Sequence, residues 1–371
     1  MSDDLPEPDR VEGAPHPRET IELFGQGAAE AAFLEAYNAG RLHSGWLITG
    51  PRGVGKATLA WKIATFLLAE APDDGLFGDP PPPTSMRVDT DHPDARLVQS
   101  GAHPRLLVVR RPYDEKTKKL KTEITVDAVR AMKGFFHMSS ADGGRRVVIV
   151  DAADEMNRSA ANAILKELEE PPSKATILLI AHQPSRLLPT IRSRCRELRC
   201  VTLGTDDLAF ALTQAGQTTE TTEALHVLAG GSAGDALALL NHDGLARYAE
   251  IVKLMEKLPS IDRPAALALA NGCTGAANAT KYALTLDLID HFLSRTARTG
   301  LMGAPASQAA PGEALLLARL SPHDRAARAW AQLQQDLSAR VRHGKSVNLD
   351  PAALILDIVF KIEDTARACL A

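Results

Sequence analysis

Residues 50–57 contain a glycine-rich loop that places strong limits on how the surrounding chain can fold. The loop reads Gly-Pro-Arg-Gly-Val-Gly-Lys-Ala, close to the pattern G-x-x-x-x-G-K-[ST] whose backbone N–H groups surround phosphates. It follows the apolar run Trp46 to Ile48 and precedes a helical pattern that starts near Lys56. Strand, loop and helix in this order predict a P-loop on a parallel α/β sheet.

The last position of this loop departs from the pattern. Ala57 stands where a Ser or Thr hydroxyl would reach Mg²⁺, and Thr58 lies one residue later, about 100° further round the helix. Two interpretations remain open: the loop holds ATP or ADP with Mg²⁺ weakly, or it is retained empty. The predicted nucleotide-binding residues are Gly50, Pro51, Arg52, Gly53, Val54, Gly55, Lys56, Ala57, Thr58 and Asp151.

Asp151 closes a second strand signal, the β-branched run Val147 to Val150. A carboxylate at this place belongs to the Mg²⁺ shell of a P-loop ATPase, and a neighbouring Glu orients the attacking water. Ala152 occupies the place of that Glu. Asp154 and Glu155 follow on a turn, where we expect them to support the turn and the next helix rather than catalysis.

Strand signals at 106–111 and 175–182 alternate with helical patterns, and beyond about residue 201 the patterns are helical only. We predict an α/β P-loop domain with a parallel sheet over 1–202, a small helical lid domain over 203–243 and an all-α domain over 244–371. Residues 1–18 are expected to be mobile. The Pro-rich segment 73–102 is expected to be a loop insertion without regular helix, and 114–123 a charged, solvated excursion.

Composition excludes several classes of function. The formal net charge is -4, so there is no overall basic excess of the kind that drives autonomous binding to nucleic acid. The acidic start and the absence of an apolar run near 20 residues predict a cytoplasmic protein without membrane contact. The 4 cysteines do not form a disulfide framework, and Cys195 and Cys200 lack a second ligand pair, so no zinc or other metal site is expected.

Three segments together resemble the AAA+ clamp-loader subunits of bacterial DNA polymerase III, and within them the delta-prime branch. These segments are GPRGVGKATLA, VVIVDAADEMNRSAANAILKELEEPP and LLPTIRSRC. The resemblance implies an AAA+ module and a helical collar in a ring that opens the sliding clamp onto primed DNA. The implied partners are the gamma/tau and delta subunits and, indirectly, the clamp and primer-template DNA.

The resemblance also implies a role for Ser193, Arg194 and Cys195. In this family the arginine of the Ser-Arg-Cys motif reaches a neighbouring subunit's ATP as an arginine finger. Such an arginine neutralises charge that grows on the γ-phosphate during hydrolysis. Gly234 stands where the ATP-hydrolysing relatives carry a sensor arginine, and segment 73–102 has no cysteines for the zinc module that many relatives contain.

The resemblance implies a stator role in the ring, and these departures predict weak or no ATPase activity of the subunit's own. The main alternative is an ATP-hydrolysing gamma/tau-like subunit or motor in which Thr58, Asp154 or Glu155 replaces the missing groups. A P-loop kinase is a third interpretation, but nothing in the sequence resembles an arginine-bearing lid or an acceptor site.

Overall fold

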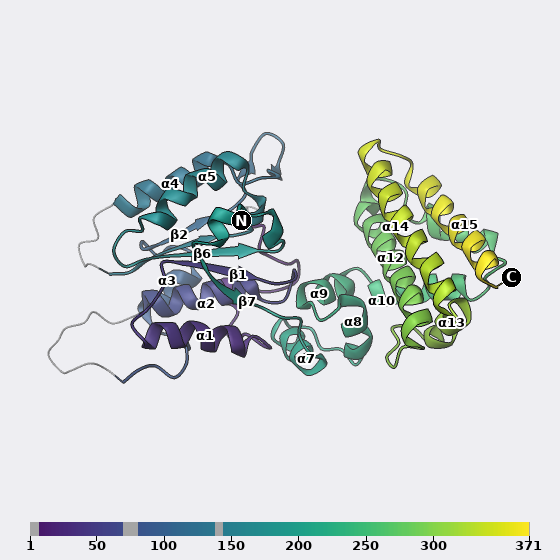
Figure 1. Cartoon of the computed structure of the whole chain (residues 1–371), viewed down its shortest axis with the longest axis horizontal. Helices are drawn as coiled ribbons and strands as arrows, with labels where there is room; N and C mark the ends of the chain where they lie inside the picture. Colours follow the sequence, from purple (N-terminus) through teal and green to yellow (C-terminus); the bar gives the residue numbers. More distant parts are fainter. Residues whose placement is uncertain (1–6, 70–80, 138–143, 371) are drawn as a thin grey trace. The chain divides into compact units, whose positions relative to one another are not determined.

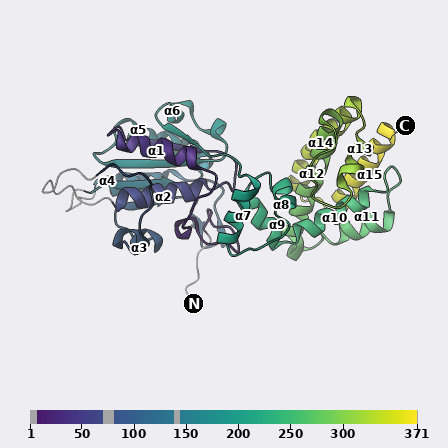
Figure 2. The ribbon, with the colours of Figure 1, turned by 90° about the horizontal axis from the view of Figure 1, so that it is seen from below.

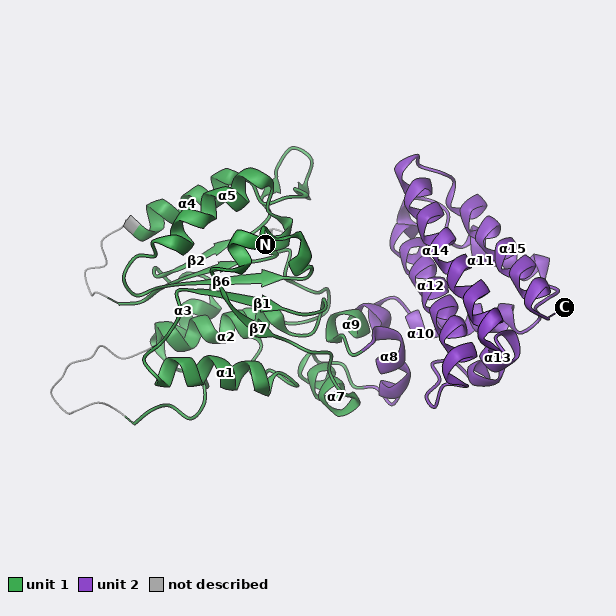
Figure 3. Cartoon of the chain, in the orientation of Figure 1, with its two compact units in different colours: residues 1–218, 231–237 green, residues 219–230, 238–371 purple. Residues whose placement is uncertain are grey.

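The structure of the chain is a computed structural model that describes residues 7–69, 81–137 and 144–370. The chain divides into two compact units (Figure 3), one comprising residues 1–218 and 231–237 and the other residues 219–230 and 238–371. The predicted domain boundaries at 202/203 and 243/244 stay predictions.

The first unit is built on a parallel sheet, as the sequence predicts. This sheet has five strands in the order β2-β5-β6-β1-β7. Its strands are β1 (Gly45–Thr49), β2 (Leu106–Val109), β5 (Arg146–Val150), β6 (Ala175–Ala181) and β7 (Arg196–Arg199). The first strand in the sequence therefore lies between β6 and β7. A change of direction in strand order at this place creates the crevice in which α/β sheets bind ligands.

Helices cover both faces of this sheet (Figure 1). On one face lie α1 (Gly27–Asn38), α2 (Lys56–Leu68) and α3 (Pro93–Gln99), which Figure 2 shows side by side, and on the other lie α4 (Val126–His137) and α5 (Arg158–Glu169). Trp46 and Ile48 point into the cluster formed with α1 and α2, whereas Leu47 points into the cluster formed with α4 and α5. Burial on both faces explains why these strands are continuous apolar runs.

The N-terminal segment differs from the mobile start that the sequence predicts. Residues 1–6 lie outside the described part, but the His16 side chain is fully buried. Its Nδ1 accepts from the backbone N–H of Arg18, and its Nε2 lies 3.1 Å from Asp9. Asp9 also accepts from the indole N–H of Trp61 on α2. These contacts hold residues 7–19 against α2.

The predicted loop at 73–102 also needs correction. The segment 73–102, of which residues 73–80 lie outside the described part, contains α3. Pro93 fits this helix because it stands at a first-turn position, where its missing N–H is not needed, and His92 caps the helix by accepting from Asp94 N–H. The charged segment 114–123 is exposed at 115–119 and 121–123, as predicted, and takes part in a short hairpin of β3 (Tyr113–Asp114) and β4 (Lys119–Leu120).

Helices make up the regular structure of the chain beyond β7. They are α7 (Thr205–Gln214), α8 (Thr222–Ala229), α9 (Ala233–Asn241), α10 (Gly244–Met255), α11 (Arg263–Asn271), α12 (Ala279–Met302), α13 (Glu313–Leu320), α14 (Asp324–Ser346) and α15 (Pro351–Leu370). In the second unit α12 packs along α14 and α10, and α15 packs on α11 and α14. Among the described residues, none of these helices combines the length and apolar character needed to cross a bilayer.

A buried ionic cluster fixes the loop before α13. The fully buried carboxylate of Glu313 accepts from Tyr248 Oη at 2.5 Å, from Arg295 Nε at 2.6 Å and from the backbone N–H of Ala309 at 2.6 Å. Arg295 also donates to the carbonyl oxygen of Ser307. Because each charge has a hydrogen-bonded partner, the cluster is tolerated in the interior.

Candidate functional site

The glycine-rich loop lies at the carboxyl end of β1, as predicted, and leads directly into α2. Two glycines are required by their surroundings. A Cβ on Gly50 would lie 2.4 Å from the carbonyl oxygen of Cys200, and Gly53 has a φ of +69°, in the left-handed region. Val54 is buried, and its carbonyl oxygen accepts from the amide of Gln26 at 3.0 Å. Pro51 and Arg52 are exposed, and Ala57 and Thr58 are half-buried at the start of α2.

Lys56 is turned toward its own loop. Its ammonium donates to the carbonyl oxygen of Gly50 at 2.8 Å and to that of Pro51. The residue is only 3% exposed, and burial lowers the pKa of Lys56 to about 8. Two of the three ammonium donors are therefore used by the backbone that a phosphate would otherwise face.

The start of α9 closes directly on the glycine-rich loop within the same unit. Gly234 N–H donates to the carbonyl oxygen of Gly53 at 3.1 Å. A Cβ on Gly53 would lie 2.2 Å from Ser232 Oγ, and one on Gly234 would lie 3.0 Å from the Cα of Gly53. The position at which the hydrolysing relatives are expected to carry a sensor arginine thus has little room here for any side chain.

Asp151 follows β5 at the same edge of the sheet and is 6% exposed. Burial, together with the nearby carboxylates of Asp9 and Glu155, raises the pKa of Asp151 to about 7 against the opposing charges of Arg110 and Arg111. Asp151 therefore occupies the place of a metal-binding carboxylate, as the sequence predicts, in surroundings that disfavour its charged form.

The two acids considered as replacements for the catalytic Glu already have other partners. Asp154 is 7% exposed, and its two carboxylate oxygens accept from the backbone N–H groups of His182 at 3.0 Å and Gln183 at 2.9 Å. Glu155 forms ion pairs with Arg111 at 2.8 Å and with Arg52 at 3.6 Å. Asp154 thus joins the turn after β5 to the end of β6, in agreement with the structural role expected for both acids.

His182 is a residue of this region that the sequence reasoning missed. It directly follows β6 and therefore lies at the same sheet edge as the glycine-rich loop and Asp151. Burial, together with the positive charges of Lys56 and Arg52, lowers the pKa of His182 to about 4. Within the described chain its buried Nδ1 has no hydrogen-bond partner. A polar residue directly after a buried parallel strand was the signal that could have identified it.

Arg194 lies between α6 (Pro189–Arg192) and β7. Its Nη2 lies 2.7 Å from Glu169 Oε1, and its Nη1 donates to the carbonyl oxygen of Thr190 at 2.9 Å. The side chain keeps 36% of its surface exposed. Ser193 Oγ also donates to the Thr190 carbonyl, and burial raises the pKa of the Cys195 thiol to about 12, so Cys195 is an inert packing residue.

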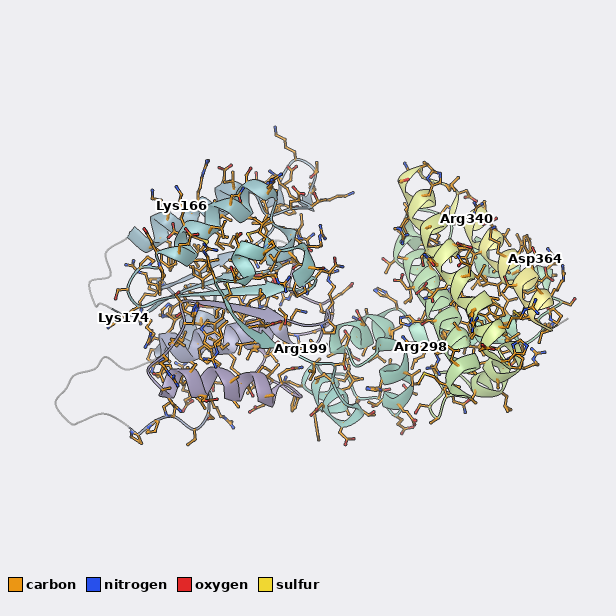
Figure 4. All side chains as sticks on the ribbon, in the orientation of Figure 1. Lys166, Lys174, Arg199, Arg298, Arg340 and Asp364 are labelled. Carbon is orange, nitrogen blue, oxygen red and sulfur yellow. The ribbon has the colours of Figure 1, made fainter. Side chains whose placement is uncertain are left out.

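Arg194 and the glycine-rich loop lie at opposite ends of the parallel strands. The loop follows the carboxyl end of β1, and Arg194 precedes the amino end of β7. β1 and β7 are parallel, with Trp46 opposite Arg196 and Thr49 opposite Arg199. The length of β1 alone separates the two ends by roughly 13 Å. Figure 4 labels a residue at each of these ends, Lys174 before β6 and Arg199 at the end of β7. The structure therefore keeps Ser193, Arg194 and Cys195 together and does not bring Arg194 to the predicted nucleotide-binding residues.

Comparisons with known proteins place the chain in a family. A family described as "DNA polymerase III, delta subunit" matches residues 25–203. The DNA polymerase III subunit delta' of Pseudomonas aeruginosa is 37% identical over 57% of this chain and 60% of its own length. The subunit of the same name from Escherichia coli is 32% identical over 64% of this chain and 67% of its own length.

Among solved structures, a DNA polymerase III gamma subunit-related protein from Thermotoga maritima overlaps 90% of this chain and 100% of its own, with a TM-score of 0.40 and 18% identity. The chain spans about 60% of the length of the Pseudomonas relative and about two thirds of the Escherichia relative. On the sequence identity to these two relatives and the family match, the chain belongs to the delta-prime family of DNA polymerase III subunits.

Proposed function

We propose that the protein is a delta-prime-like subunit of a bacterial clamp loader and works in the cytoplasm as the stator that supports loading of the sliding clamp onto primed DNA. Gamma/tau-like and delta-like subunits are the proposed direct partners, and the clamp and primer-template DNA are indirect ones. Family membership supports this role.

Arg194 is the proposed arginine finger for a neighbouring subunit. The observation that carries this assignment is its position at the end of the strands opposite its own glycine-rich loop, with 36% of its side chain exposed. From there it cannot serve a phosphate bound at its own loop. A second subunit that places its bound ATP against this edge would bring the γ-phosphate to Arg194.

The protein's own loop is proposed to bind nucleotide weakly or not at all and to hydrolyse none. Ala57 supplies no oxygen to Mg²⁺, Lys56 is bonded to its own loop, and Gly234 approaches Gly53 closely. Asp154 and Glu155, which the gamma/tau-like alternative would use as catalytic acids, are held by other groups.

The test is a reconstituted loader in which ATP hydrolysis is active only at the site facing Arg194. Arg194→Ala should slow turnover at that site by about 100-fold or more, because a missing finger leaves transition-state charge uncompensated. Arg192→Ala, an exposed arginine two residues away, is the matched control and should retain turnover. Unchanged turnover with Arg194→Ala would exclude the finger. Hydrolysis by the purified chain that disappears with Lys56→Ala would favour the ATPase alternative.

A further inference from the structure

The guanidinium of Arg194 is held by its own chain on two sides. Its Nη2 lies 2.7 Å from Glu169 Oε1, and its Nη1 donates to the carbonyl oxygen of Thr190 at 2.9 Å. A guanidinium has five N–H donors in a planar fork, so these two contacts leave others for a further anion. The 36% exposure of the side chain is consistent with such a partly engaged fork.

The backbone around this pair is fixed by packing on one glycine. Gly45 opens β1, and a Cβ there would lie 2.9 Å from Leu168 Cδ2, 3.2 Å from the carbonyl oxygen of Arg194 and 3.3 Å from Cys195 Sγ. Leu168 directly precedes Glu169 at the end of α5. The last turn of α5 and the backbone of Arg194 therefore both pack against Gly45. This shared packing sets the distance between Glu169 and Arg194.

The exposure of both partners argues against a role of the pair in stability. Glu169 keeps 45% of its side chain exposed and Arg194 36%, and ion pairs of this kind contribute little to folding. The pair instead restricts the side-chain conformations of Arg194. A long arginine side chain loses much rotamer freedom when it binds an anion, and a side chain already restrained loses less.

We propose that Glu169 is the positioning residue of Arg194: with the Thr190 carbonyl it orients the guanidinium so that its remaining N–H groups are presented to the phosphates of a neighbouring subunit. This inference rests on the proposed finger role of Arg194. Glu169 itself touches no nucleotide and acts only through the arginine.

The test uses the same loader with one active site. Glu169→Ala should lower kcat at that site about three- to tenfold with little change in KM for ATP, corresponding to the rotamer freedom that the arginine regains. Glu169→Gln retains an acceptor oxygen and should recover most of the rate. Glu170→Ala removes the adjacent exposed acid and should match the parent. Glu169→Ala combined with Arg194→Ala should be no slower than Arg194→Ala alone.

The outcomes separate the two claims. If Arg194→Ala is slow but Glu169→Ala has the parent rate, the positioning role is wrong and the finger stands. A faster Glu169→Ala variant would mean that the carboxylate competes with phosphate, which also overturns the inference. If Arg194→Ala retains turnover, the proposed function fails and the positioning role fails with it. Thermal unfolding of each variant, expected to match the parent, excludes loss of fold as the cause.

Discussion

The backbone N–H of Gly234 donates a hydrogen bond to the carbonyl oxygen of Gly53 over 3.1 Å, and this bond joins the start of α9 to the glycine-rich loop. It brings together two segments that are far apart in the sequence. Each of the two glycines approaches the other's backbone so closely that an added Cβ would touch it. The start of α9 therefore holds the glycine-rich loop in its present shape, as does the Lys56 side chain.

Gly234→Ala should destabilise the first unit by about 1–2 kcal/mol, because its Cβ would lie 3.0 Å from the Cα of Gly53. Denaturation followed by tryptophan fluorescence measures this in a Trp330→Phe background, which leaves Trp46 and Trp61 as reporters in the first unit. Gly134→Ala is the control. A Cβ at this position in α4 meets nothing within 4 Å, so this change should stabilise by about 0.5–1 kcal/mol. Equal effects of the two changes would contradict the close approach.

Asp154→Ala should lower the free energy of unfolding of the first unit by about 2–4 kcal/mol. The change leaves the N–H groups of His182 and Gln183 without the charged acceptor that the buried Asp154 provides. Asp154→Asn keeps one acceptor oxygen and should lose about half as much. If Asp154→Ala instead removed a measurable ATPase activity without loss of stability, the acid would be catalytic.

Asp151 should make stability depend on pH. Its folded-state pKa is raised from 3.8 to about 7, so between about pH 4 and pH 7 the unfolded chain loses this proton while the folded chain retains it. The stabilisation from Asp151 is then complete below pH 4 and declines as pH rises to 7, by up to about 4 kcal/mol. The difference in unfolding free energy between the parent and Asp151→Asn should change over this window. A constant difference would show that Asp151 titrates normally.

Glu313→Gln should destabilise the second unit by about 3–5 kcal/mol, since it leaves Arg295, whose side chain is 18% exposed, without its countercharge. Circular dichroism of chemical unfolding measures the loss. Asp324→Asn is the control, because it breaks an exposed pair with Arg328 on α14 and should cost less than about 1 kcal/mol. Similar losses for the two variants would mean that the Glu313 cluster is not a buried ion pair in solution.

The features that the sequence predicted correctly depend on local signals. A β-branched run followed by Asp151, and an apolar run followed by the glycine-rich loop, identify strand ends without knowledge of the rest of the chain. Because β5 and β1 are parallel, Asp151 and the glycine-rich loop lie at the same ends of the strands.

The features that the sequence did not predict depend on contacts between distant residues. His16 is buried because Asp9 and Trp61 surround it, and neither partner is visible in the local pattern of a polar, Pro-containing segment. The two bonds accepted by Asp154 come from residues that follow the next strand in the chain. The helix α3 required the recognition of His92 as a cap and Pro93 as a first-turn residue.

The parallel pairing of β1 with β7 also gives the protein a polarity. The carboxyl ends of its strands carry the glycine-rich loop, and Arg194, a cation with N–H donors beyond its two contacts, lies at the opposite ends. If contacts with other subunits use these ends, each contact joins unlike surfaces, so the subunits follow one another head to tail and a twofold-symmetric pair is excluded. A subunit with the proposed lack of ATP hydrolysis would then supply Arg194 to the ATP site of the subunit on one side. On its other side it would end the row of ATP-hydrolysing subunits.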